Sequence, residues 1–223
     1  MKLKFLLFLL PLLALAALAY PRLHRRYARF QQTHRAETEV ARLTPKLHDG
    51  DLIFQTSTSA QSQAIQLATH SPYSHCGILF RRNNAWRVFE AIQPVSETSL
   101  AAWTARGQGG KFVVKRLHDA ATVLTPAALQ RLQAVGEQYR GKSYDLYFGW
   151  SDDRIYCSEL LWKMYQQATG REIGQLETLR EFDLSHPAVQ AKLKERYGNQ
   201  IPLNEKVISP VRMFESQELV EVR

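Results

Sequence analysis

The chain has 223 residues, of which 45% are hydrophobic and 22% are charged, so it can bury the core of one ordinary domain and is not a disordered protein. Its two cysteines allow at most one disulfide, which excludes a disulfide-rich scaffold. The formal net charge is +8, but no nucleic-acid recognition motif accompanies it, and we expect no nucleic-acid partner.

The N-terminus predicts a secretory signal peptide over residues 1–19. Lys2 and Lys4 precede an apolar run over residues 5–18, and residues 17–19 (ALA) have the small-x-small form of a cleavage site. The alternative is an uncleaved membrane anchor, although about 15 apolar residues are few for a span that needs roughly 20. In either case we expect an exported body, periplasmic or anchored so that it faces the periplasm.

Residues 20–44 form a polar, basic lead-in that is compatible with a helix. Its excess of positive charge precedes the first acidic residue of the chain and comes from Arg22, Arg25, Arg26, Arg29 and Arg35. Such a run can lie against anionic lipid head groups or form the solvated face of a helix. Peripheral membrane contact through this segment is therefore one expected interaction.

Residues 45–223 are predicted to form one α+β domain, because no linker divides them. The first half contains a strand, a helix capped by Ser59 and two strands joined at Asn83-Asn84, a pair that tolerates turn dihedrals. These elements are GDLIFQ (50–55), SAQSQAIQLAT (59–69), HCGILFRR (75–82) and AWRVFEAI (85–92).

The second half is predicted to alternate strand and helix before the pattern weakens. KFVVKRL (111–117) alternates polar and apolar residues as a half-buried strand does. A helix begins at Thr125-Pro126 and ends at Gly141, and another follows position 157 and stops at Gly170. Beyond residue 171, IPLNEKVISPVRMF is predicted as loop and edge strand over the core.

Cys157 stands at the start of the last of these helices, in DDRIYCSELLWKMY. The free N–H groups and the positive end of the helix dipole favour a thiolate there. The same N–H groups can donate to an oxyanion as it forms. A thiolate nucleophile also needs a general base, without which Cys157 would be a buried structural cysteine.

His75 is the candidate base, because it opens an apolar strand where an imidazole needs polar partners. If Asn83 and Asn84 form a two-residue turn, His75 faces Ile92 and lies diagonal to Glu90; another register with the same parity would place Glu90 opposite. A carboxylate there would fix the tautomer of the imidazole and stabilise its cation. The alternatives, a structural histidine and a structural salt bridge, remain open at this point.

Cys76 follows His75, and successive strand residues point to opposite faces. We therefore expect Cys76 to pack away from the cleft as a small hydrophobe and not to form a disulfide with Cys157. A metal site made of His70, His75 and Cys157 is another alternative, but its ligand spacing matches no common zinc pattern. We expect neither a metal nor a cofactor.

Five stretches in this order resemble the YiiX-like branch of the permuted papain-like cysteine amidases, which are relatives of the NlpC-type cell-wall hydrolases and, more distantly, of lecithin retinol acyltransferase. The similarity covers about residues 47–215, and its motifs are GDLIFQTSTSAQSQAIQLATHSPYSHCGI, VFEAIQPV, GGKFVVKRL, GKSYDLYF and DDRIYCSELLWKMY. It implies a papain-like α+β fold in circularly permuted order. In that order the histidine strand precedes the nucleophile helix, and an antiparallel sheet packs against helices.

The resemblance also implies roles for individual residues. It assigns the nucleophile to Cys157 of YCSEL, the base to His75 of YSHCG and the orienting acid to Glu90 of VFEA. Cysteine at position 76 departs from the aliphatic residue that is usual there. Further residues are expected near the substrate, namely Tyr156, Tyr73, Asp145 and Asp51, although a structural role is favoured for Asp51.

Together these observations predict an exported cysteine amidase or peptidase that forms an acyl-enzyme on cell-envelope peptides or other amides. One alternative is a lipid-type acyl hydrolase or acyltransferase at the membrane surface. The other is a wall-binding module that keeps the fold without turnover. An intact set of nucleophile, base and acid favours an enzyme.

Overall fold

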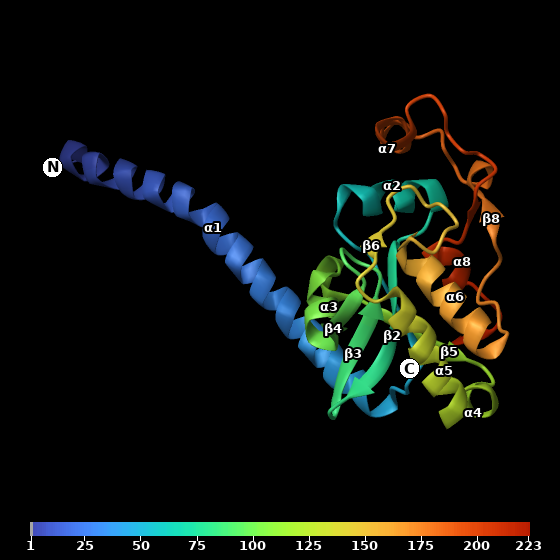
Figure 1. The fold of residues 1–223 in the computed structure, drawn as a ribbon. Coiled ribbons are helices and arrows are strands. Elements are labelled where there is room, and N and C mark those ends of the chain that lie inside the picture. Colours follow the sequence, from blue (N-terminus) through green and yellow to red (C-terminus); the bar gives the residue numbers. More distant parts are fainter. Residues whose placement is uncertain (1) are drawn as a thin grey trace.

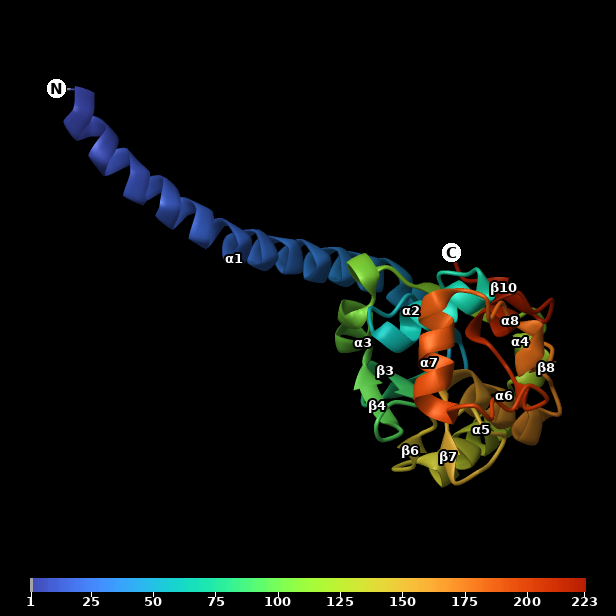
Figure 2. The same cartoon turned by 90° about the horizontal axis from the view of Figure 1, so that it is seen from above.

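The computed structural model describes the backbone of residues 2–223 and the side chains of residues 20–223 other than Arg22, Arg25 and Arg29. The chain begins with one long helix, α1 (Lys2–Leu43), whose N-terminal part projects away from the body (Figure 1 and Figure 2). The side chains of the predicted signal peptide lie outside the described residues. Within the described part, no helix combines the length and apolarity needed to cross a membrane.

The C-terminal turns of α1 pack on the body. Ala36 is buried, and the side-chain amide of Gln32 donates to the carbonyls of Ala105 at 3.0 Å and Gly107 at 2.7 Å. Gly110 has φ +68°, and a Cβ there would lie 2.8 Å from the Gln32 carbonyl oxygen, so only glycine permits this close approach. The predicted helical lead-in is a helix, and its end contributes to the core.

A six-stranded antiparallel sheet forms the centre of the body, in the order β10-β5-β1-β2-β3-β4. It confirms the four predicted strands. The strands are β1 (Leu52–Gln55), β2 (His75–Arg82), β3 (Ala85–Glu90), β4 (Ser96–Ser99), β5 (Val113–Leu117) and β10 (Leu219–Glu221).

The β2–β3 hairpin has the register that places the predicted base beside the predicted acid. Asn83 and Asn84 adopt positive φ values of 49° and 63°, as a two-residue hairpin turn requires. Arg82 therefore pairs with Ala85, and the ladder continues from there to the pairing of Ile78 with Phe89. This register follows from the turn and confirms the predicted two-residue connection.

Helices cover both faces of the sheet (Figure 1). Leu52, Phe54, Ile78 and their neighbours on one face pack against α5 (Pro126–Tyr139) and α6 (Cys157–Thr169). On the other face, Ile53 and Leu79 pack against the end of α1 and against α3 (Leu100–Arg106). The alternation along each strand thus divides the core into two layers.

The predicted helix boundaries agree with the structure because they depend on local capping. Ser59 caps α2 (Ala60–Thr69) by accepting from the Ser62 N–H at 3.1 Å. Thr125 caps α5 in the same way, and Gly170 ends α6 in the left-handed conformation with φ +73°.

The segment after residue 171 is more regular than predicted. It contains a helix that was not predicted, α7 (Pro187–Tyr197), beside α2. The stretch predicted as loop and edge strand contains loop and a short strand, β9 (Lys206–Val207), but this strand pairs outside the main sheet and the short helix α8 (Pro210–Phe214) follows it. The strand β10, at one edge of the main sheet, comes later in the chain. The remaining elements are α4 (Ala120–Val123), β6 (Ser143–Tyr144), β7 (Arg154–Ile155), β8 (Glu177–Thr178), α7 (Pro187–Tyr197), β9 (Lys206–Val207) and α8 (Pro210–Phe214).

Candidate active site

Cys157 is the first residue of α6, and its side chain is buried within the core cluster between α6 and the sheet. Tyr156 precedes it in an extended conformation at the N-cap position, and the Tyr156 hydroxyl accepts from the Ile208 N–H at 3.0 Å. The helix therefore begins at the sulfur, where first-turn N–H groups and the helix dipole favour negative charge.

His75, the first residue of β2, lies beside Glu90, the last residue of β3. His75 Nε2 is 2.6 Å from Glu90 Oε2, and the imidazole stacks on the Trp103 ring with 5.9 Å between centroids. The Glu90 side chain is fully buried, whereas that of His75 is 13% exposed. The Glu90 carboxylate therefore orients the imidazole through Nε2 and leaves Nδ1 for the nucleophile.

Four side chains donate to the buried Glu90 carboxylate. Besides His75, they are Thr98 at 2.5 Å, the Trp103 indole at 2.9 Å, and the guanidinium of Arg106. Burial raises the pKa of Glu90, but the hydrogen bonds and positive charges of these partners outweigh it, so the net pKa is lowered. Glu90 is therefore a carboxylate at neutral pH.

Cys157 and His75 form a coupled acid–base pair. Burial lowers the pKa of His75, but hydrogen bonds with Cys157 and Glu90 outweigh it and raise the value from 6.5 to about 9. The pKa of Cys157 is lowered well below its usual value, first by a hydrogen bond from the Cys76 side chain and then by the hydrogen bond and charge of His75. The two shifts favour a thiolate–imidazolium pair at neutral pH.

The position of Cys76 corrects the expectation that it points away from the cleft. Cys76 is buried, as predicted, but its thiol and its backbone N–H both reach Cys157. His75 and Cys76 do point to opposite faces, but Cys157 lies on the face of Cys76, because both cysteines belong to the core layer of α5 and α6. His75 lies on the other face, against Trp103, and reaches Cys157 from the first position of β2. Burial, followed by the Cys157 interaction, raises the pKa of Cys76, so it remains a protonated donor. Both cysteines are free thiols.

Two hollows meet at this pair. The apolar groove borders Cys157 and is lined mainly by aliphatic and aromatic side chains of α2, α7 and nearby loops, among them Ile65, Ala68, Phe148, Leu179, Phe182 and Leu193. The second hollow, called the polar hollow because it has the larger share of polar lining, borders His75. It combines the polar side chains of Gln55, Ser57, Ser62, Ser74, Gln93 and Arg106 with the apolar ones of Ile65, Ala91, Ile92 and Leu146. Hence the nucleophile and the base face environments of different polarity.

Tyr144 is a site residue that the sequence-based prediction missed. It lines both hollows, and its hydroxyl accepts from Gln61 Nε2 at 3.2 Å. Burial, then the negative charge of Cys157 and a hydrogen bond to it, raise the pKa of Tyr144, so it stays protonated beside the sulfur. The available signal was its place in the GKSYDLYF motif.

The structure divides the four residues expected near the substrate. Tyr156 lines the apolar groove. Asp145 lines neither hollow; its carboxylate accepts from the N–H groups of Tyr147 at 2.9 Å and Gly149 at 2.8 Å, and so shapes the loop that follows Tyr144.

Tyr73 and Asp51 also lie outside both hollows. Tyr73 stacks on Phe214 with 3.9 Å between ring centroids. Asp51 is fully buried and paired with Arg116 Nε at 2.6 Å, which agrees with the structural role favoured for it. Internal partners thus occupy both side chains, and a place for either residue at the substrate stays a prediction.

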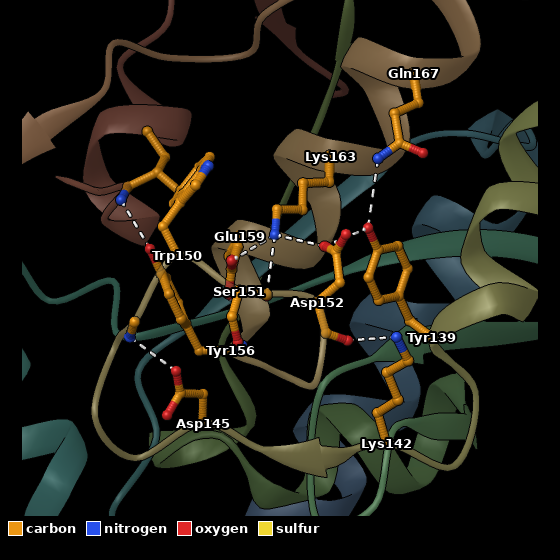
Figure 3. Close-up of polar contacts among 12 residues, drawn as sticks. Tyr139, Lys142, Asp145, Trp150, Ser151, Asp152, Tyr156, Glu159, Lys163 and Gln167 are labelled. Atoms are coloured by element: carbon orange, nitrogen blue, oxygen red, sulfur yellow. Dashed lines mark hydrogen bonds and ion pairs between the residues drawn. The ribbon is translucent and has the colours of Figure 1, made fainter. Parts of the chain in front are cut away.

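An ionic network that runs from the buried Glu159 and Lys163 to the exposed Asp152 supports the start of α6 (Figure 3). Lys163 pairs with Glu159 and Asp152, each at 2.8 Å, and donates to the Ser151 carbonyl at 3.1 Å. Tyr139 donates to Asp152 at 3.0 Å from the neighbouring helix α5. These contacts fix the loop before Cys157 to the helix that carries it.

A cysteine at a helix start, facing a histidine on an antiparallel strand that is oriented by an acid, defines the papain-like class of cysteine enzymes. The family model for the permuted papain-like amidase enzymes, YaeF/YiiX, C92 family, matches residues 46–223. The chain therefore belongs to the YaeF/YiiX family of permuted papain-like amidases.

Two relatives agree with this assignment. The uncharacterized protein YiiX of Escherichia coli strain K12 is 53% identical over 173 residues, which are 78% of this chain and 84% of that protein. A crystal structure described as the metalloprotein yiiX from Escherichia coli O157:H7 superposes with a TM-score of 0.75 at 52% identity, over 79% of this chain and 96% of that one. The match confirms the permuted papain-like α+β fold.

Because that relative is described as a metalloprotein, ligand geometry in this chain is relevant. Within the part of the chain that the structure describes, no three His, Cys, Asp or Glu side chains are grouped so that they could hold a metal ion. His70 pairs instead with Asp183 at 3.0 Å. The described residues thus do not fit a metal at the Cys157–His75 pair, and no catalytic step is derived through one.

Proposed function

We propose that the chain is an exported cysteine amidase in which Cys157 is the nucleophile, His75 the general base and Glu90 the orienting acid. The observation that carries the proposal is the continuous chain of contacts from Cys157 through His75 to the fully buried Glu90. Each contact supplies what cysteine-dependent acyl transfer requires: an ionised sulfur, a proton carrier and a group that fixes the carrier.

The reaction begins with attack of the Cys157 thiolate on the carbonyl carbon of an amide. First-turn N–H groups of α6 are placed to donate to the oxyanion. His75 then gives its proton to the leaving amine, and the C–N bond breaks to leave a thioester. Neutral His75 next takes a proton from water, whose oxygen attacks the thioester; the acid is released and the thiolate and imidazolium form again.

The proposed substrate is a cell-envelope peptide or a related amide. Export is supported by the basic and apolar pattern of residues 1–19. Contact with the membrane surface is supported by the exposed positions of Arg26 and Arg35 on α1. Both features would place the amidase where envelope amides are found.

The test is incubation of the protein with muropeptide and lipid libraries, followed by mass spectrometry of substrates and of adducts on sulfur. Cys157→Ala and His75→Ala are expected to abolish turnover, whereas His118→Ala, an exposed histidine paired with Asp119, is the matched control. An acyl adduct on Cys157 supports the proposal. Turnover that survives in Cys157→Ala, or a thiol probe that labels Cys76 in preference to Cys157, contradicts it.

A non-catalytic wall-binding module is the competing reading of the same site. It predicts muropeptide affinity without turnover in the wild-type chain, and unchanged affinity in Cys157→Ala. The ionised sulfur is the feature that argues against it, because binding alone needs no thiolate.

A further inference from the structure

The two sides of the catalytic pair differ in chemistry. The apolar groove next to Cys157 is walled by α2 and α7, and it includes the buried side chain of Leu193 and the partly buried Phe182. The polar hollow next to His75 is lined by serine and glutamine side chains such as Ser74 and Gln93. An extended substrate that crosses the site meets an apolar surface on one side and a more polar, mixed surface that includes Ile92 and Leu146 on the other.

The proposed acyl-transfer chemistry fixes which end of a substrate lies on which side; this step rests on the proposed function. The acyl carbon must bond to the sulfur of Cys157, so its substituent extends on the Cys157 side. The leaving group must receive a proton from His75, so it departs on the His75 side. The acyl substituent therefore faces the apolar groove, and the amine or alcohol faces the polar hollow.

The size of the apolar groove suits a thin aliphatic chain. The space open to water-sized groups is about 90 Å³. One such group needs about 10–15 Å³ of this space, so the groove holds several of them. Lys192 and Arg196 of α7 also border the groove, but most of its open surface is apolar. A peptide with several backbone polar groups would therefore bury some of them without partners there.

We propose that the apolar groove binds an unbranched aliphatic acyl chain of the substrate, and that the polar hollow binds a hydrophilic leaving group. The protein then releases a fatty acid from an acyl amide or ester. The Cys157 thiolate attacks the acyl carbonyl, His75 protonates the departing amine or alcohol, and water hydrolyses the thioester to the carboxylic acid. Each methylene buried in the groove strengthens substrate binding about fourfold.

The first experiment measures kcat/KM for straight-chain acyl p-nitroanilides, from acetyl upward. We expect the rate to rise several-fold with each methylene and to level off at a medium chain length, where the groove is full. A profile that does not change with chain length overturns the proposal.

Groove variants locate the effect. Ala68→Phe fills the groove, and it is expected to lower turnover of the octanoyl substrate at least tenfold while acetyl turnover is kept. Leu193→Ala widens the groove and should shift the preference toward longer chains. Ala127→Phe, on the exposed surface of α5, is the matched control and should leave the profile unchanged. An equal loss for all chain lengths in Ala68→Phe, with no shift in Leu193→Ala, overturns the proposal.

Two further arms separate the sources of the acyl chain. Release of octanoate from N-octanoyl amino acids would identify an acyl amide, and release from dioctanoyl phosphatidylglycerol micelles would identify a glycerolipid; either supports the acyl site. Turnover of muropeptides without any dependence on chain length leaves the proposed function intact and refutes only this inference. If no amide or ester is cleaved and Cys157 is not selectively alkylated, the proposed function fails as well.

Discussion

Replacement of Glu90 by glutamine tests the electrostatic basis of the site. The substitution keeps the shape of the side chain and removes the negative charge that lies 2.6 Å from His75 Nε2. Because Glu90 is fully buried, little solvent screens that charge. We therefore expect the imidazolium form of His75 to lose stabilisation, and the thiolate of Cys157 with it.

The size of the effect follows from the pKa of His75. That pKa is about 9 instead of 6.5, a difference of about 2.5 units, which at 1.36 kcal/mol per unit is about 3 kcal/mol. Cys157 and Glu90 share this stabilisation; if Glu90 supplies about half, Glu90→Gln lowers the pKa of His75 by about one unit. Since the pKa is raised in the folded state, the stabilisation is complete below pH 6.5 and is lost as pH rises through about 9.

The assay is the rate of Cys157 alkylation by iodoacetamide from about pH 5 to about pH 10, with the labelled residue identified by mass spectrometry. In the wild type, reactive thiolate should persist into mildly acidic solution, and the ion pair should be lost near pH 9. In Glu90→Gln the acid side of the alkylation profile should move to higher pH, and the alkaline side should move to lower pH by about one unit. The value of kcat/KM should fall about tenfold or more.

The matched control is Glu97→Gln. Glu97 lies on the neighbouring strand β4, and its carboxylate pairs with Arg82 and Arg140. This substitution should leave the alkylation profile unchanged. Identical profiles for the wild type and a folded Glu90→Gln variant would refute the claim that this carboxylate holds the imidazolium.

Three further outcomes are expected. Cys76→Ala should move the acid limb of Cys157 alkylation to higher pH, because the thiol that donates to the thiolate is lost, and Cys76→Ser should restore part of the shift. Tyr144→Phe should lower kcat/KM about tenfold or more without a change in Tm, because a hydroxyl donor beside the sulfur is removed. Burial raises the pKa of Glu159 from 4.5 to about 7, although Lys163 opposes the shift. The protonated Glu159 carboxyl therefore contributes stability that is present below pH 4.5 and is lost as pH rises through about 7. Urea unfolding of Glu159→Gln should lack that pH dependence.

Those parts of the fold that depend on local signals could be predicted from the sequence. The Asn83-Asn84 turn determines the hairpin register, and this register places Glu90 diagonally next to His75. Ser59 likewise determined a helix start. In each case a short stretch of chain carries the whole physical cause, so no tertiary information is needed.

Features that depend on tertiary packing were missed. Helix α7 has only two buried side chains, Val189 and Leu193, among many charged residues, so its periodicity is weak until α2 packs beside it. The prediction for Cys76 assumed that Cys157 lies on the His75 face of the sheet, whereas α6 and Cys157 pack on the face of Cys76. Tyr144 belongs to a two-residue strand that a sequence pattern cannot reveal.

Charges of alternating sign connect the surface to the sulfur, in the order Arg106, Glu90, His75 and Cys157. Each buried charge in this series has an opposite charge beside it, which offsets the cost of removing it from water. When the sulfur becomes a thioester and the proton leaves with the amine, Cys157 and His75 become neutral together. Glu90 would then be a buried carboxylate without its imidazolium, but Arg106, Thr98 and the indole still donate to it. The carboxylate therefore stays ionised through the cycle and is ready to stabilise the cation when water returns the proton.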